Sequence, residues 1–487
     1  MFKDEPRVKL WDALGQRDLQ AFGRLLQRQQ LVEAAKRAGI GLGSGPLSLV
    51  TLTWLSLSSA LHTSKNFADV LVLTLKLLSD MPGWAGSPLG SQCASRPTAS
   101  CRGRKRHDPR SRSPGSVSEE AFVQARRHLP LSFWASLLSV LGEQFEARHP
   151  QHVQWKDFRL LMLDGSQLAL PRWKRLAGYF GSSSNGKAGR RTQARIVMLA
   201  LAQARLPWRY ELSPSKEHEQ AVAHRLLSSL RGGDLVLMDR GFWSYALFWQ
   251  IVNQQASFAI RLRRKTPLKT LERLGPGERL VTWKPRKKSR RKGLASWAGL
   301  PAQITLRVIE YQMRGFRKSA VVTNILDPKR VSRDEWVRLA ARDEKGRILE
   351  AGLYHRRWEV ETLFHELKVD QGLEGSLRGR SPQTIAYEVA GHVLLYLLTR
   401  WLIVEAAVKH GCQPLRLSFV QAQRELQDLR WALLASSPQR VAAILLPRLL
   451  RRIAQHTIPF RPGRHFPRIS DRYKPGKYRI HNRSSGK

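Results

Sequence analysis

The sequence predicts an α/β protein in which a helical, basic N-terminal unit precedes a mixed layer of strands and helices. Apolar residues recur at three- and four-residue steps over residues 16–80, which is typical of amphipathic helices. From about residue 155, short apolar runs bounded by turn residues alternate with helical patterns. Short buried strands mixed with helices indicate helices layered against a sheet. At 487 residues the chain is too long for one ordinary core, so several domains are expected.

The charge balance restricts the partners that this chain can have. Lys and Arg number 83 against 38 Asp and Glu, which leaves a net charge of +45. Such an excess repels itself in the compact state and favours an anionic partner. Duplex DNA carries a phosphate charge about every 1.7 Å of its axis, so we expect DNA, with an acidic membrane surface as the alternative.

Residues 1–150 are predicted to form a helical DNA-binding domain, with a basic linker at 81–115 that is rich in Pro, Gly, Ser and Arg. The stretch 45–61 has no charged residue, but Ser, Thr and Gly dilute it, so we expect a buried helix and no membrane span. The charged N-terminus lacks the apolar run of a signal peptide, and three scattered cysteines favour neither disulfides nor a thiolate metal site. A cytoplasmic protein is therefore expected.

Five apolar runs predict the strands of the central layer. In chain order they are "FRLLMLD", "ARIVMLALAQA", "LPWRYEL", "GDLVLMD" and "ASFAIRLR", and a helical pattern at 217–231 lies between the third and the fourth. We assign residues 151–264 to the first part of the core and residues 336–410, where helical patterns return, to its second part.

Residues 265–335 are predicted to form a β-rich insertion, because "ERLVTWKP", "ITLRVIEYQM" and "KSAVVTNIL" have no helical pattern between them. The insertion contains "KPRKKSRRK" at 284–292, with seven basic residues in nine. This run is either a solvated loop or a DNA contact, and we prefer DNA contact through Lys287, Lys288, Arg290 and Arg291. Residues 411–487 are predicted to be C-terminal helices and a basic tail.

Two aspartates, Asp164 in "LMLDGS" and Asp239 in "VLMDRGF", each follow an apolar run and precede turn residues. We expect both at the C-terminal ends of strands. An aspartate there is often only a turn former. In α/β sheets, however, ligands gather at the carboxyl ends of strands, so the pair is a candidate site.

The segment "YHRRWEVETLFHELK", residues 354–368, is predicted to be one helix. At about 100° per residue, Tyr354, Arg357, Glu361 and Lys368 share a strip roughly 60° wide beside an apolar strip. Glu359 and Glu366 fall on the opposite side, which suits solvent. The simplest interpretation of Arg357 and Glu361 is a surface i,i+4 ion pair.

Together with the two aspartates, Glu361 suggests a metal site instead. Three carboxylates can hold two divalent cations through oxygen ligands, and Mg²⁺ suits such a site, with Mn²⁺ expected to substitute. Two metals roughly 3.5–4 Å apart would activate the attacking oxygen and stabilise the leaving one during displacement at phosphorus. Arg357 and Lys368 would hold phosphates beside them.

These residues resemble the DDE triad and the Y-(2)-R-(3)-E-(6)-K signature of the insertion-sequence-4 family of bacterial transposases, because the spacing from Tyr354 to Lys368 matches at every position. The resemblance implies a ribonuclease-H-like catalytic core interrupted by a β insertion. It implies Mg²⁺-dependent hydrolysis at the ends of the chain's own insertion element, a hairpin in characterised relatives, and strand transfer into target DNA. It also implies a homodimer or larger synaptic assembly in the bacterial cytoplasm, associated with the nucleoid.

Trp358 follows the signature arginine, where a relative has an aromatic residue near the flipped-base site. Stacking on an extruded base is one interpretation of Trp358 and structural packing is the other. A sequence-specific DNA-binding protein without catalysis and a Mg²⁺-dependent nuclease of the same fold are the alternative functions. The first explains the charge but not the three carboxylates, and the second would not need the strip of Tyr354, Arg357 and Lys368.

Overall fold

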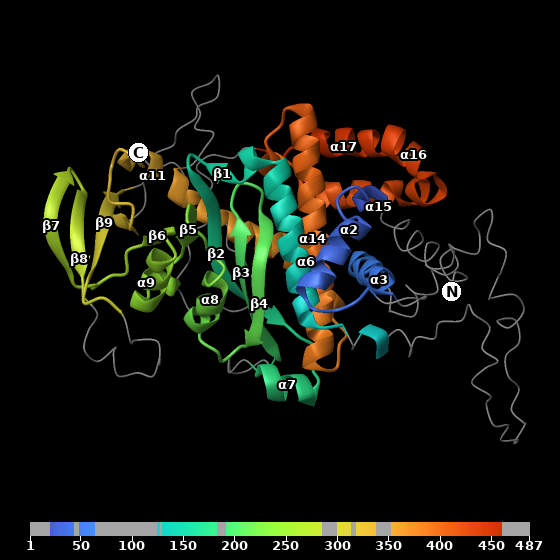
Figure 1. The fold of residues 1–487 in the computed structure, drawn as a ribbon, viewed down its shortest axis with the longest axis horizontal. Coiled ribbons are helices and arrows are strands. Elements are labelled where there is room, and N and C mark those ends of the chain that lie inside the picture. The colour runs from blue at the N-terminus through green and yellow to red at the C-terminus, as the bar shows by residue number, and fades with distance from the viewer. Residues whose placement is uncertain are drawn as a thin grey trace, which may run out of the picture.

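One mixed ten-stranded sheet forms the centre of the protein (Figure 1). The computed structural model describes residues 20–42, 48–63, 124–126, 129–182, 191–284, 300–312, 318–337 and 352–459. The strands are β1 (Gln154–Trp155), β2 (Phe158–Ala169), β3 (Gln193–Leu201), β4 (Leu206–Pro214), β5 (Asp234–Met238), β6 (Ser257–Arg261), β7 (Leu268–Gly275), β8 (Glu278–Trp283), β9 (Ile304–Tyr311) and β10 (Ser319–Thr323). Their order across the sheet is β4-β3-β2-β5-β6-β10-β9-β8-β7, and β1 pairs with β2.

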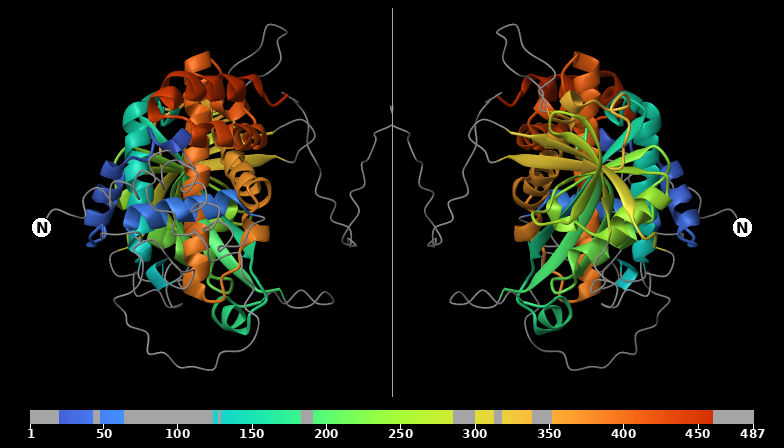
Figure 2. Two further views of the ribbon diagram at one scale, coloured as in Figure 1. Left: turned by 90° about the vertical axis from the view of Figure 1, so that its right-hand side faces the viewer. Right: turned by 90° about the vertical axis from the view of Figure 1, so that its left-hand side faces the viewer.

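The strand directions divide the sheet into three parts. Strands β4, β3 and β2 pair antiparallel, β2, β5 and β6 pair parallel, and β6, β10, β9, β8 and β7 pair antiparallel. The five predicted runs form β2 to β6, which confirms them as strands. Strands β7 to β10 continue this same sheet, since β10 pairs with β6. Strand β7, which pairs with β8, was not predicted. Figure 2 shows the strong twist of the sheet, with helices on both of its sides.

The helices lie on both faces of the sheet and along its β4 edge. They are α2 (Arg28–Arg37), α3 (Leu49–Leu61), α6 (Leu131–Arg148), α7 (Lys174–Phe180), α8 (Glu219–Leu227), α9 (Tyr245–Asn253), α11 (Arg333–Val337), α12 (Glu359–His365), α13 (Leu373–Ser376), α14 (Pro382–His410), α15 (Phe419–Ala435), α16 (Pro438–Arg440) and α17 (Leu446–Gln455). Shorter 3-10 turns are η1 (Gln20–Phe22), η2 (Pro150–His152), η3 (Arg240–Phe242), η5 (Leu353–Trp358) and η7 (Pro414–Arg416), and π-helical turns are η6 (Glu366–Asp370) and η8 (Val441–Leu445).

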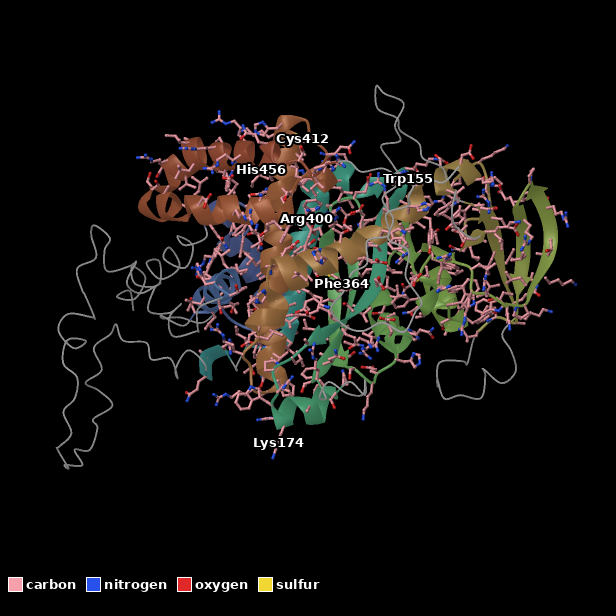
Figure 3. All side chains as sticks on the ribbon, turned by 180° about the vertical axis from the view of Figure 1, so that it is seen from behind. Trp155, Lys174, Phe364, Arg400, Cys412 and His456 are labelled. Carbon is pink, nitrogen blue, oxygen red and sulfur yellow. The ribbon has the colours of Figure 1, made fainter. Side chains whose placement is uncertain are left out.

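Helices α8 and α9 cover the face of the sheet that is turned to the viewer in Figure 1, and α12 covers the opposite face, which Figure 3 shows with Phe364 labelled. The predicted helical pattern at 217–231 is confirmed by α8. Helix α3 is buried, as expected for 45–61.

Helix α14 is long and apolar enough to cross a membrane, but 94% of its most apolar 18-residue stretch is buried inside the protein. It begins at the cap of Ser381, whose side chain accepts from the Thr384 N–H, and ends before Gly411, which has a φ of +66°. Gly391 lies against α3, because an added Cβ would meet the Ser56 carbonyl oxygen at 3.1 Å. A side chain there would push the two helices apart, so α3 packs closely on α14.

Several predicted segments lie outside the described residues. They include the whole linker at 81–115, most of the basic run at 284–292, with Lys287, Lys288, Arg290 and Arg291, and the tail from 461. The division into domains remains a prediction.

Candidate active site

Asp164 and Asp239 come directly after two residues that are register partners on neighbouring parallel strands. Leu163 of β2 is the register partner of Met238, the last residue of β5, so the next residue on each strand is an aspartate. Paired residues of parallel strands point to the same face of a sheet, and neighbouring strands are about 4.8 Å apart. The structure therefore brings together two aspartates that are far apart in the sequence.

A buried ion pair at the start of the two strands holds this register. Arg159 and Asp234 are register partners, and the Arg159 guanidinium donates to both carboxylate oxygens of Asp234, at 2.7 and 2.8 Å. Both side chains are almost fully buried, at 4% and 0% exposure. A slip by one residue would break this pair and would turn the aspartates to opposite faces, since side chains alternate along a strand.

The prediction that Asp164 ends a strand is wrong, whereas Asp239 does follow β5 directly. Strand β2 continues to Ala169, because it pairs with β3 as far as Ala169↔Gln193. Past Leu163, β2 has no partner on the β5 side, since β5 ends at Met238. The polar residues after Asp164 therefore belong to a half-buried strand edge, although their composition is typical of a turn.

The signature segment is three kinds of helix and not one, which corrects the prediction. A 3-10 turn, η5, precedes α12, and the π-helical turn η6 follows it. Val360, Leu363 and Phe364 are buried, as the helical phase predicts. Tyr354 is buried and its hydroxyl donates to the carbonyl oxygen of Met238 at 3.0 Å, so η5 is attached to the residue before Asp239.

Arg357 connects the signature segment to the sheet. Its guanidinium lies 3.3 Å from the Glu361 carboxylate and 3.9 Å from the Asp164 carboxylate, and its side chain is 7% exposed. Glu361 is more open, at 42% exposure. The predicted ion pair of Arg357 and Glu361 is therefore present, but it lies beside Asp164 and not on a free surface.

Lys368 contacts the same strand, two and three residues beyond Asp164. Its ammonium group donates to the carbonyl oxygen of Gln167 at 2.6 Å and to the hydroxyl of Ser166 at 3.3 Å, and it lies 3.0 Å from the Glu374 carboxylate. Arg357 at Asp164 and Lys368 at Ser166 and Gln167 thus place two positive charges along β2.

Glu366, expected in solvent, is buried, which corrects the helical-phase prediction. Its carboxylate accepts from Arg205 at 2.8 Å and from the Tyr396 hydroxyl at 2.7 Å, and Arg400 lies 3.8 Å away. Glu359, the other residue expected on the wet side, pairs with Arg205. Glu359 and Glu366 share one side of the segment, as predicted, since both pair with Arg205. This side does not meet solvent, because Arg205 and, from α14, Tyr396 and Arg400 cover Glu366.

Asp164 carries the strongest electrostatic perturbation of this site. Burial raises the pKa of its carboxyl to about 7, against the hydrogen bond from the Gly165 N–H and the charge of Arg357, which lower it. The carboxylates of Glu219 and Glu361 raise this pKa further. A neighbouring cation would relieve this accumulation of negative charge.

Glu219, in the first turn of α8, is a residue near the site that sequence reasoning missed. A Cβ added at Gly165 would lie 1.8 Å from the Glu219 Oε1 atom, and one at Gly241 would lie 3.9 Å from Oε2. Its carboxylate also pairs with Arg195 at 3.3 Å. The glycines of "LDGS" and "DRGF" thus leave room for a fourth carboxylate, and nothing local to Glu219 signals this contact.

The chemistry of the carboxylates fits a divalent cation, since Asp164, Asp239 and Glu361 are all oxygen donors and Asp164 ionises with difficulty when no cation is near. Within the described residues, no three His, Cys, Asp or Glu side chains are grouped so that they could hold one ion together. The Arg357 guanidinium lies near both Asp164 and Glu361, where it stands in for part of the positive charge that a cation would supply.

Trp358 is 50% exposed, and the Arg357 guanidinium lies over its ring at 4.7 Å. The ring is therefore not a core side chain, and one of its faces is covered by a cation.

Comparisons with known proteins identify the family of this chain. The family model "Transposase DDE domain" matches residues 155–398. The chain is 25% identical over 372 residues to the transposase InsG for insertion sequence element IS4 of Escherichia coli (strain K12), which covers 74% of this chain and 78% of that protein. A cryo-EM structure of the piggyBac transposase synaptic complex with hairpin DNA matches with a TM-score of 0.32 and 13% identity, over 64% of this chain and 59% of that one. The chain therefore belongs to the DDE transposases of the insertion-sequence-4 family.

Proposed function

We propose that this transposase cleaves DNA at the ends of its own insertion element and transfers the freed strand into target DNA, in reactions that depend on Mg²⁺ or, as a substitute, Mn²⁺. The observation that carries the proposal is the placement of Asp164 beside Asp239, with Arg357 next to Asp164 and Glu361. The mixed sheet, whose parallel strands carry both aspartates, supports a ribonuclease-H-like core.

In this proposal Asp164, Asp239 and Glu361 are the catalytic residues and hold the metal. Two bound cations would supply the activation of the attacking oxygen and the stabilisation of the leaving oxygen. The raised pKa of Asp164 favours this role, because the carboxylate gains most from a cation that neutralises it.

The signature cations would position the DNA. Arg357 lies beside Asp164 and Lys368 lies further along β2, at Gln167, so the two can hold phosphates next to the reacting one. Tyr354 holds the end of β5, and the half-exposed Trp358 offers a ring face to an extruded base. A phosphate bound by Arg357 would take up the charge that now pairs with Glu361, which would leave the Glu361 carboxylate as an oxygen donor for a cation.

We further propose that the protein acts as a homodimer in a synaptic complex with its terminal inverted repeats and target DNA, in the bacterial cytoplasm and associated with the nucleoid. The net charge of +45 supports a DNA partner and association with the nucleoid.

The proposal is tested by cleavage of labelled DNA that contains the sequences flanking the element. Purified protein is incubated with Mg²⁺, Ca²⁺ or EDTA, beside Glu361→Gln and a control variant, Glu272→Gln, which changes an exposed carboxylate on β7. We expect cleavage at the repeat boundary that needs Mg²⁺ and Glu361 but not Glu272.

Two outcomes would favour the alternative functions. Binding without cleavage under any metal would indicate a sequence-specific DNA-binding protein. Cleavage at many positions, with no joining of the cut end to target DNA, would indicate a nuclease of the same fold.

A further inference from the structure

A second surface of the protein combines exposed cations with exposed aromatic rings. It lies on α7, on the loop before it and on the loop before α14, and we call it the α7 surface. Trp173 is 43% exposed and Tyr179 is 58% exposed. The Arg380 guanidinium lies 4.7 Å from the centre of the Trp173 ring. The residues of the α7 surface are Arg172, Trp173, Lys174, Arg175, Tyr179 and Arg380.

The short helix turns these side chains outward for a simple reason. Leu176 and Phe180, four residues apart, are buried at 0% and 2% exposure and attach α7 to the protein. Because residues four apart share one face of a helix, Lys174, Arg175 and Tyr179 are left on the open side. Figure 3 labels Lys174 at the end of the molecule where α7 projects.

The cations of the α7 surface form no ion pair with carboxylates among the described residues. Residues 170–180 contain no Asp or Glu. In the part of the chain that the structure describes, Arg172, Lys174, Arg175 and Arg380 have no carboxylate within 4.0 Å. Exposed cations without a carboxylate partner suit a polyanion such as the phosphate backbone of DNA.

The α7 surface is connected to the candidate active site through β2. From Asp164 to Ala169 the strand spans about 17 Å, at roughly 3.3 Å per residue. Glu374 accepts from the Ala169 N–H at 3.2 Å and pairs with Lys368 at 3.0 Å, so the end of β2 and the signature lysine share one partner. The loop to α7 then adds several ångströms, which places the surface roughly 20 Å from the aspartates.

We propose that the α7 surface binds the backbone of the DNA whose reacting phosphate lies at Asp164 and Asp239, with Lys174 and Arg175 on phosphates. This inference rests on the proposed function for its geometry. At about 3.4 Å per nucleotide, roughly 20 Å corresponds to about five to seven nucleotides from the reacting phosphate. Nucleic acid is recognised here by charge and ring surface, without a base-specific contact.

The experiment compares the wild type with Lys174→Ala/Arg175→Ala in the full-length chain. Binding to duplex DNA that contains the element end is measured over a series of salt concentrations, with Ca²⁺ present, and the complex is mapped by hydroxyl-radical footprinting. The control, Lys409→Ala/Arg451→Ala, removes two exposed cations from the end of α14 and from α17, at the opposite end of the molecule from α7 (Figure 1). Thermal unfolding confirms that both variants are folded.

Each phosphate contact contributes about 0.9 to the slope of log K against log salt concentration. We expect the α7 variant to lose about 1.8 from that slope and to lose backbone protection about five to seven nucleotides from the cut, while protection at the cut remains. The control should keep both the slope and the footprint. A slope and a footprint equal to those of the wild type would overturn the inference.

The two proposals fail differently. If the wild type cleaves the element end and the α7 variant binds as the wild type does, only the inference about α7 is wrong. If the wild type binds and never cleaves, but the α7 variant loses salt dependence and protection, the α7 surface does bind DNA and the catalytic proposal is wrong.

Discussion

Replacing Asp164 by Asn should stabilise the fold at pH 8 and leave its stability unchanged near pH 4. Burial, with the carboxylates of Glu219 and Glu361, raises the pKa of Asp164 from 3.8 to about 7. The folded protein therefore keeps this proton in a pH range in which the unfolded chain has lost it. The contribution of the protonated Asp164 carboxyl to the free energy of unfolding is fully present below pH 4 and is lost as the pH rises through 7.

The size of the effect follows from the difference in pKa. One pKa unit corresponds to about 1.4 kcal/mol, so a difference of about three sets an upper limit of about 4 kcal/mol on the cost of the ionised carboxyl at pH 8. The opposing effects of Arg357 at 3.9 Å and of the Gly165 N–H are already contained in this pKa. The Asp164 side chain is 19% exposed, so water at the carboxyl reduces the cost of its charge. We expect a net gain of about 1–3 kcal/mol, which is roughly 2–10 °C in thermal midpoint for a domain of this size.

The assay is thermal unfolding of wild type and Asp164→Asn at several pH values between 4 and 8, with EDTA and then with MgCl₂. The variant should be more stable at pH 8 and equal to the wild type at pH 4. Mg²⁺ should raise the midpoint of the wild type more than that of the variant, because a ligand stabilises the state that binds it. If the variant were less stable than the wild type at pH 8 without metal, the reasoning on Asp164 would be refuted.

Three other substitutions test the surroundings of Asp164. Glu219→Gln should shift the pH dependence that Asp164 causes to lower pH, because a charge that raises its pKa is removed; the same series of melts measures it. Glu366→Ala should cost about 3–5 kcal/mol in urea unfolding, because Arg205 and Arg400 lose a buried partner. Tyr354→Phe should cost about 1 kcal/mol in the same assay, because the Met238 carbonyl loses its hydrogen bond.

Matched controls separate these effects from general damage. Glu33→Ala removes an exposed carboxylate from an i,i+4 pair with Arg37 and should change stability by about 0.5 kcal/mol or less. Tyr179→Phe removes an exposed hydroxyl and should be neutral. An unchanged pH profile for Glu219→Gln, or losses for Glu366→Ala and Tyr354→Phe no larger than their controls, would contradict the contacts described here.

Local patterns in the sequence predicted much of the fold. The runs that form β2 to β6 are apolar and bounded by turn residues. A buried strand needs such a run whatever it packs against, so the pattern can be detected in the sequence alone. Strand β7 was missed because most of its residues are exposed, so it has no apolar run to detect. The turn assigned after Asp164 failed because strand edges and turns share the same polar residues.

The spacing from Tyr354 to Lys368 and the two aspartates after apolar runs are properties of the sequence by itself, and they were enough to indicate the candidate site and the family. The contacts that assemble this site were decided by the tertiary structure. Asp164 and Asp239 meet because the Arg159–Asp234 pair holds β2 and β5 in register. Glu219 approaches because Gly165 leaves it room, and Glu366 is buried because Arg205 and residues of α14 cover it. Each of these contacts joins residues more than twenty positions apart, so no local period or spacing contains them, and only the packed chain brings them together.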